Sequence, residues 1–259
     1  MLTRFLPVFF LALGSGAAAQ QIRFVNQLAS GANSGQTWND AFTNLDVALA
    51  ASVAGDDLFV MTGAGQVYVP LASSGFALPV GVDLFGGFTS ASQLTTSARP
   101  RSANGLLTAL SDLAGAGALH VLNLTGAGSG TNTVDGFIAR GGNANGTGVD
   151  SSGGGIVIAP PAGSNRLVQL TELSVLNNSA VTTGGGLFAS SVFILRMRRV
   201  HLNENTAGLD GGALFLSQGF QFRSDDCVFD GNSAGRNGGG VFITATNLAG
   251  NGQPLTEFE

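Results

Sequence analysis

Two adjacent carboxylates, Asp225 and Asp226, and the histidine at position 201 are the residues of this sequence best suited to chemistry. Paired carboxylates near a histidine could supply the acid and the base that cleave a glycosidic bond. Zinc chemistry is not favoured, because the two histidines and the one cysteine are far apart in sequence and offer no ligand spacing. What the three residues can do therefore depends on the elements that position them.

These side chains lie in a repeat with a period of about 27 residues. Each unit has short apolar runs separated by Gly, Asn, Asp and Ser, a pattern typical of strands joined by turns. A fixed period of this length indicates stacked units, so we expect each repeat to form one coil of a β-solenoid. The period is set by three columns of like residues: Asn178, Asn205 and Asn232; Gly185, Gly212 and Gly239; Phe188, Phe215 and Phe242.

The three asparagines follow a strand directly and fall at a turn. Residues one repeat apart become neighbours in adjacent coils, roughly 4.8 Å from one another. A side-chain amide at such a position can donate to the coil on one side and accept from the coil on the other. The sequence therefore predicts a stacked ladder of Asn178, Asn205 and Asn232.

The same register offers a structural explanation for the paired carboxylates. Asp226 lies one repeat after Arg199, Arg199 lies one repeat after Glu172, and Asp225 lies one repeat after Arg198. This spacing predicts ion pairs between adjacent coils, which contribute roughly 0–1 kcal/mol each when exposed and mainly fix the register. Neighbouring arginines would also lower the carboxyl pKa values, which is the wrong direction for a general acid. We therefore predict no catalytic residue and keep Asp225, Asp226 and His201 as the alternative.

Two of the repeats resemble a known family. The segments Phe229-Asp-Gly-Asn232 and Gly211-Gly-Ala-Leu214 resemble the FxxN and GGA-aliphatic repeats of polymorphic outer membrane proteins. More broadly, the chain is similar to secreted bacterial proteins of the pectate-lyase-like superfamily. The earlier repeats depart from FxxN, with Val175 and Leu202 in place of Phe, and the clear repeats cover residues 172–243. The resemblance implies an all-β fold, a right-handed parallel β-helix, and says little about function.

Residues 1–19 have the pattern of a secretory signal peptide. A positive charge at Arg4 precedes an apolar run over residues 5–13 and a small-residue cleavage site at Ala17–Ala19. That run is shorter than the roughly 20 residues needed to span a bilayer. We expect a secreted or cell-surface protein, with outer-membrane association left open. Its mature chain, residues 20–259, would form one β-helix domain without a transmembrane segment.

Residues 37–52 are predicted to form an α-helix that caps the first coil. Thr37 and Asp40 have nearly the spacing of a capping box. Trp38, Phe42 and the following leucines form one apolar face. Trp38 is expected to be buried, and stacking on a sugar is its alternative role. At the other end we expect an open last coil, which further coils or another chain would cover.

Composition limits the possible functions. The net charge is −5 and charged residues make up only 10% of the chain, so a basic surface for nucleic acid is not expected. Residues 89–106 are expected to leave the coil as a loop. Residues 141–152 and 160–165 are expected to be coil insertions that line the binding surface. The expected role is structural or adhesin-like, with a glycan or a surface protein as partner. The alternative is a carbohydrate-active enzyme, a polysaccharide lyase or glycoside hydrolase. No cofactor is predicted, although calcium in an Asp/Asn turn stays open.

Overall fold

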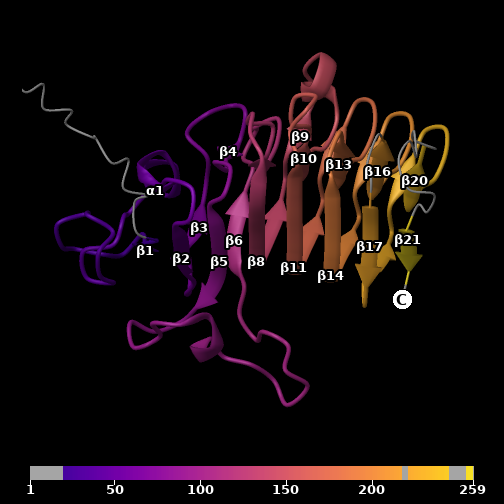
Figure 1. The fold of residues 1–259 in the computed structure, drawn as a ribbon. Coiled ribbons are helices and arrows are strands. Elements are labelled where there is room, and N and C mark those ends of the chain that lie inside the picture. Colours follow the sequence, from indigo (N-terminus) through magenta and orange to yellow (C-terminus); the bar gives the residue numbers. More distant parts are fainter. Residues whose placement is uncertain (1–19, 218–220, 245–254, 259) are drawn as a thin grey trace, which may run out of the picture.

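The computed structural model describes residues 20–217, 221–244 and 255–258, with side chains for all but the last of these segments. Strands of successive coils lie side by side along the molecule, from the N-terminal end to the C-terminal end (Figure 1). All the described strand pairs are parallel, and these strands form three sheets. The predicted all-β parallel β-helix is confirmed. The predicted signal peptide, residues 1–19, lies outside the described residues.

The three sheets are the three sides of each coil. The large sheet contains β1 (Ile22–Val25), β2 (Asp57–Met61), β3 (Val67–Tyr68), β5 (Asp83–Phe88), β6 (Ser111–Ala114), β8 (Gly130–Arg140), β11 (Arg166–Leu176), β14 (Ile194–Asn203), β17 (Gln221–Asp225), β18 (Val228–Asp230) and β21 (Leu255–Phe258). The second sheet contains β4 (Phe76–Ala77), β7 (Leu122–Asn123), β10 (Ile156–Ile158), β13 (Leu187–Ser190), β16 (Leu214–Ser217) and β20 (Val241–Ile243). The third contains β9 (Asn143–Ala144), β12 (Ser179–Ala180), β15 (Thr206–Ala207) and β19 (Ser233–Ala234).

The strand register gives the length of each coil. Leu173 on β11 pairs with Val200 on β14, and Leu187 on β13 pairs with Leu214 on β16, so both pairs are one sequence repeat apart. The coil before these is longer, because Leu173 also pairs with Phe137 on β8, which lies more than one repeat before it. The additional residues enter through the loops around the 3-10 helix η2 (Gly148–Ser151) and before β11.

Left-handed backbone conformations form the corners of the coil. Gly184, Gly211 and Gly238 have φ values of 63°, 66° and 59° at the same place in three successive coils. A Cβ atom on Gly211 would lie 2.4 Å from the carbonyl oxygen of Leu214, a distance that real Cβ atoms do not reach. Glycine is therefore required at this corner for both its conformation and its size. This explains the spacing of the glycine clusters in the sequence.

Alternate residues of the strands fill the interior with apolar side chains. Val175 and Leu202, which replace Phe in the earlier repeats, are both fully buried and in register. Phe229 continues their column and packs against the core from a half-buried position. Stacking of like residues on the inside gives a continuous apolar core along the solenoid, and this core holds the outward-facing side chains in fixed rows.

The helix near the N-terminus is shorter than predicted. Helix α1 covers Leu45–Ala51, and Asn44 caps it by accepting hydrogen bonds from the backbone N–H groups of Asp46 and Val47. Residues 37–44 are not helical, because Phe42 forms a bridge with Val25 of β1 and the Thr37 hydroxyl closes a local turn with Asp40. The prediction of a helix over 37–52 was therefore wrong for residues 37–44.

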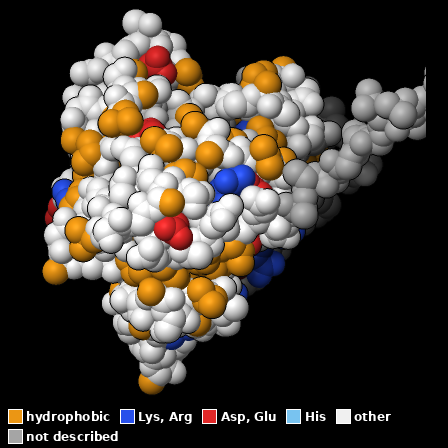
Figure 2. Space-filling view, turned by 90° about the vertical axis from the view of Figure 1, so that its left-hand side faces the viewer, with side chains coloured by type: hydrophobic (Ala, Val, Ile, Leu, Met, Phe, Trp, Pro, Cys, Tyr) orange, Lys and Arg blue, Asp and Glu red, His pale blue; other side chains and the backbone are white. Residues whose placement is uncertain are grey.

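The predicted apolar face of that helix is nevertheless buried. Leu45 and Leu49 belong to the main core cluster, so α1 packs against the first coils. Trp38 is 5% exposed and packs in an aromatic cluster with Phe24 and Phe88. A ring buried in this way is not available to a sugar. Seen from this end, the surface is mostly uncharged, with hydrophobic side chains scattered over it (Figure 2).

A long loop between β5 and β6 leaves the coil and hangs beside the large sheet, in magenta below the strands of Figure 1. It contains the 3-10 helix η1 (Thr96–Ala98). Arg99 anchors its middle: the guanidinium is almost fully buried, donates to Asp135 on β8 at 2.8 Å and lies over the ring of Phe88. The loop is therefore tied to the sheet face.

Candidate functional site

One column of the large sheet, hereafter the bend column, departs from regular strand geometry in four successive coils. Glu172, Arg199 and Asp226 have φ values of 51°, 54° and 53°, and the register places Gly136, with φ 88°, before them. A positive φ in residues other than glycine is uncommon and costs of order 1–3 kcal/mol. The surrounding strands hold these three residues in that conformation. Their charged side chains therefore emerge from a bend and not from the regular pleat.

Glu172 is the buried anchor of this column. Its side chain is 6% exposed, and its carboxylate accepts from Arg199 at 2.8 Å, from Arg101 at 3.4 Å and from the backbone N–H of Leu107 at 3.1 Å. A buried carboxylate needs such partners, because desolvation without them would be costly. Two of the three donors come from the loop between β5 and β6. Glu172 therefore fastens residues 99–107, hereafter the 99–107 loop, to the outer face of the sheet.

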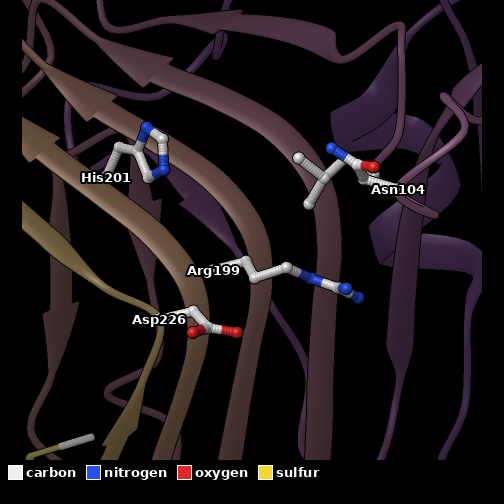
Figure 3. Close-up of a pocket in the computed structure, with 5 residues that line it drawn as sticks. Asn104, Arg199, His201 and Asp226 are labelled. Atoms are coloured by element: carbon white, nitrogen blue, oxygen red, sulfur yellow. The ribbon is translucent and has the colours of Figure 1, made fainter.

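A pocket of about 300 Å³ lies between this loop and the bend of β14. Arg199 reaches across it toward the loop, while His201 and Asp226 lie on the strand side and Asn104 on the loop side (Figure 3). Leu106 completes the lining. The pocket thus combines one cation, one carboxylate, an amide, an imidazole and one apolar side chain. These groups can donate to and accept from a polar ligand and cover a small apolar surface.

The guanidinium of Arg199 is fixed by an ion pair with Glu172, but not all of its N–H groups donate a hydrogen bond. Its side chain is 20% exposed and its terminal nitrogen binds Glu172. The Nε atom is buried and has no hydrogen-bond partner among the residues that the structure describes. A guanidinium has five N–H donors, so Arg199 keeps donor capacity. Because Glu172 fixes its position, the pocket is organised before a ligand enters.

The three residues that could do acid/base chemistry do not all lie in one site. His201 and Asp226 line the pocket, whereas Asp225 does not. Both oxygens of Asp225 accept from Nε of Arg223 on the same strand at 2.9 Å, and Asp225 is in register with Arg198. The paired carboxylates of the sequence therefore point to different surroundings. Residues 225 and 226 do not act together in one site.

Among the five residues predicted to form inter-coil ion pairs, one ion pair is seen in the described part of the chain, between Glu172 and Arg199. Glu172 and Arg199 are in direct contact, as described above, and Arg198 is opposite Asp225. Asp226 follows Arg199 in the bend column and shares the pocket with it. Glu172–Arg199 is thus an ion pair of the bend column that connects two coils.

The asparagines form one column beside the site. Oδ1 of Asn205 accepts from the backbone N–H and from Nδ2 of Asn178, at 3.1 and 3.0 Å. Oδ1 of Asn232 accepts from the same two groups of Asn205, at 2.9 and 3.0 Å. Each Nδ2 also donates to a backbone carbonyl, and for Asn205 the acceptor is Val175 at 2.9 Å. Asn178 and Asn205 are almost fully buried.

Burial and neighbouring groups shift the pKa values of several titratable side chains away from the pocket. Burial raises the pKa of Asp57, and the charge of Asp83, opposite it on the next strand, raises it further. Burial also raises the pKa of Asp83. A hydrogen bond from Arg236 lowers the pKa of Asp210. Arg166 is fully buried among carbonyl and amide oxygens, and burial lowers its pKa to about 10.

The described part of the chain holds no group of three or more His, Cys, Asp and Glu side chains that could bind a metal ion. The expectation of calcium in an Asp/Asn turn therefore has no ligand cluster to support it within residues 20–217 and 221–244. No helix among the described residues is long and apolar enough to cross a membrane.

Sequence reasoning did not find the loop side of the pocket. Arg101, Asn104, Leu106 and Leu107 lie in or next to a stretch that was expected to leave the coil, and no repeat or spacing connects them to Glu172 or to β14. The contacts of Arg101 and Leu107 with Glu172 join positions 71 and 65 apart in sequence. The available signal was the length of the insertion, since loops of this kind often line binding surfaces.

The fold and the repeat define the class of protein. The chain is a parallel β-helix with repeats of the polymorphic membrane protein type. Residues 226–244 match the family model of the Chlamydia polymorphic membrane protein (Chlamydia_PMP) repeat. This match points to an outer-membrane or cell-surface protein. Comparison with curated proteins and with solved structures gives no match.

Proposed function

We propose that this protein is an adhesin-like surface β-helix that binds a glycan in the pocket between β14 and the 99–107 loop. The observation that carries the proposal is the pocket itself, lined by Asn104, Leu106, Arg199, His201 and Asp226. Ligand sites combine a few convergent polar groups with apolar surface, and about 300 Å³ is at the lower end of their usual size. The membrane protein repeat at residues 226–244 supports a location at the cell surface.

The buried anchor supports binding by a preformed site. Glu172 holds Arg199 from one side and the 99–107 loop from the other. A site that is already ordered loses less conformational entropy when its ligand binds, which raises affinity. Hydroxyl groups of a sugar both donate and accept hydrogen bonds. They are therefore suited to a lining that contains the carboxylate of Asp226 and the guanidinium of Arg199.

A carbohydrate-active enzyme is the second candidate, and the presence of His201 and Asp226 in one pocket favours it. Glycoside hydrolysis by the usual route needs two carboxyl groups on either side of the scissile bond. Among the described residues, Asp226 is the one carboxylate of the pocket lining, because Glu172 is buried behind Arg199 and Asp225 pairs with Arg223. The geometry therefore supports binding better than hydrolysis.

A glycan array probed with the secreted chain tests the proposal. We expect binding to a restricted set of glycans, and a loss of at least tenfold in affinity in Asn104→Ala and in His201→Ala, since each removes a hydrogen-bonding group. Asn145→Ala is the matched control, because Asn145 is also an exposed asparagine but lies outside the pocket lining. Binding that both pocket variants retain would contradict the proposal. Release of new sugar ends during the assay would favour the enzyme.

A further inference from the structure

His120 is a buried histidine that takes no part in the pocket. Its side chain is fully buried, two residues before β7. Nδ1 lies 2.8 Å from the carbonyl oxygen of Gly153, and Nε2 lies 3.3 Å from Oδ1 of Asp150 on η2. The side chain of Asp150 is 46% exposed, so the ring is enclosed while its partner reaches water. The segment with η2 connects β9 of the third sheet with β10 of the second, whereas the pocket lies on the large sheet.

Both ring nitrogens of His120 face an oxygen that accepts hydrogen bonds. The carbonyl oxygen of Gly153 cannot donate, and neither can an ionised carboxylate. A neutral imidazole has one N–H group and one lone pair, so it can donate to one of these oxygens while its lone pair faces the other. Both contacts are favourable together only if the ring is an imidazolium, or if Asp150 is protonated and donates to Nε2. The observed arrangement therefore contains one proton more than a neutral ring and an ionised carboxylate.

Asp150 is the titratable group that faces His120 in the described part of the chain. The histidine and the segments that pack around it are residues 73–75, 118–121, 142–155 and 179–183. Apart from His120 and Asp150, these segments consist of uncharged residues that do not titrate. The protonation of the pair is therefore set by the two groups themselves and by the oxygen of Gly153.

Asp150 ends a short exposed segment, residues 145–150, hereafter the strap. The strap forms a turn closed on itself, in which the N–H of Gly146 donates to the carbonyl of Asp150 at 3.1 Å. The two serines that follow are fixed to the coil by hydrogen bonds with Thr182 at 2.9 and 2.7 Å. Among the strap side chains, that of Asp150 is the one whose hydrogen bond reaches the coil within the described structure. The contact with His120 therefore holds the strap in place.

We propose that the His120–Asp150 pair is a pH-sensitive switch that holds the strap against the coil at acidic pH and releases it as the pH rises. The closed strap contains the additional proton, so a fall in pH favours closing and a rise in pH favours opening. A histidine side chain ordinarily changes its charge between about pH 5 and pH 8, and we expect the release in this range. The inference goes beyond the proposed function and is independent of the pocket.

Burial decides which of the two contacts is lost with the proton. Gly153 is buried, so its carbonyl would have no water to replace the N–H of the ring. Asp150 is half exposed and can turn its carboxylate into water. The neutral ring therefore keeps its N–H at Nδ1 for Gly153 and presents the lone pair of Nε2 to the carboxylate. This repels Asp150, and the strap moves away with it.

Amide hydrogen exchange of the whole chain, measured between about pH 5 and pH 8, tests the switch. Each rate is divided by the intrinsic exchange rate at that pH, so that the resulting protection factor reports opening alone. The reporters are the amides of Gly146 and Ser152, which donate to Asp150 and Val149 in the closed turn. We expect their protection to fall at least fivefold from the acidic to the alkaline end, and by no more than about tenfold per pH unit, the limit for one proton. The amides of β11 should keep their protection.

Asp150→Asn separates the proton from the contact. The amide of asparagine can donate to the lone pair at Nε2 of a neutral ring, while the N–H at Nδ1 still donates to Gly153, so the strap closes without an added proton. We expect the variant to be better protected than the wild type at alkaline pH and to lose the pH dependence. Asp150→Ala should leave the strap open throughout. Asp230→Asn is the matched control, because Asp230 is an exposed aspartate on β18, and its pH profile should be that of the wild type.

Each possible failure has its own signature. Strap protection that stays constant over the pH range would overturn the switch, and so would a pH dependence that Asp150→Asn retains. A parallel loss of protection in β11 would also overturn it, because the whole coil and not the strap would then be opening. The wild-type pH profile needs no variant, so the test stands even if a substitution impairs folding. Glycan binding is measured separately on the array, and its failure would leave the switch intact.

Discussion

Replacement of Asn205 by alanine tests the structural role of the asparagine column. The side chain of Asn205 is fully buried. Its Oδ1 accepts from two groups of Asn178, while its Nδ2 donates to Val175 and to Asn232. The substitution removes all of these bonds at once. Because the site is buried, water can replace them only if the coil opens locally.

The expected loss follows from the groups left without a partner. Nδ2 of Asn178 keeps the carbonyl of Ala139, and Oδ1 of Asn232 keeps the backbone N–H of Asn205. The backbone N–H of Asn178 and the carbonyl of Val175 lose the bonds that Asn205 supplied. An unsatisfied buried group costs about 1–3 kcal/mol, so the free energy of unfolding should fall by about 2–5 kcal/mol.

Urea unfolding and amide hydrogen exchange measure the effect. Thr206→Ala is the matched control, because Thr206 is the exposed neighbour of Asn205 and its loss should change stability by less than about 0.5 kcal/mol. In Asn205→Ala the amide of Asn178 should also exchange much faster, since its acceptor is gone. A variant whose free energy of unfolding stays within about 0.5 kcal/mol of the control, with unchanged exchange at Asn178, would refute the reasoning.

Three other predictions address the corners, the anchor and the acids of the solenoid. Gly211→Ala should destabilise more than Gly148→Ala in urea unfolding, because both have a positive φ but only at Gly211 would the Cβ meet a carbonyl oxygen; equal losses would argue against the clash. Glu172→Gln should free the 99–107 loop and speed its cleavage by trypsin, since two arginines and one N–H lose a buried carboxylate; an unchanged cleavage rate would contradict the anchor. Asp57→Asn should raise the free energy of unfolding at pH 7 by about 0.2–1 kcal/mol by ending the repulsion from Asp83. The raised pKa of Asp57 means that folding favours its protonated form, so the wild type gains stability as the pH falls and the advantage of the variant should disappear below about pH 4. A pH-independent advantage would show that charge is not the cause.

The coil was predictable because each of its features repeats. A corner needs glycine, an inward column needs an apolar residue, and a side-chain amide stacks best on its own kind. Gly184, Gly211 and Gly238 thus mark the turn at constant spacing, and Val175 and Leu202 mark the interior. The start of α1 was not predictable from local pattern, because the pairing of Phe42 with β1 is a tertiary contact that overrides helix propensity.

The loop side of the pocket was not predictable for a related reason. A repeat connects residues by their distance in sequence, whereas Arg101 and Leu107 reach Glu172 across a chain segment that has no counterpart in the clear repeats. Glu172 could be recognised from the sequence as a member of a repeat column. Arg101 and Leu107, which donate hydrogen bonds to it from the loop, could not be recognised in this way. The sequence alone suggested exposed ion pairs, while the structure shows a carboxylate that is almost fully buried.

The position of the pocket follows from what a solenoid column requires. In the corner column of Gly184, Gly211 and Gly238, glycine recurs in three successive coils because the backbone conformation requires it. In the bend column the same left-handed conformation is kept, but the residue changes from Gly136 to Glu172, Arg199 and Asp226. Glycine would satisfy this conformation at lower cost, since a side chain in the left-handed region is strained. The charged residues are therefore not explained by the backbone. They are explained by what their side chains do: Glu172 holds the 99–107 loop, and Arg199 and Asp226 face the pocket that this loop encloses.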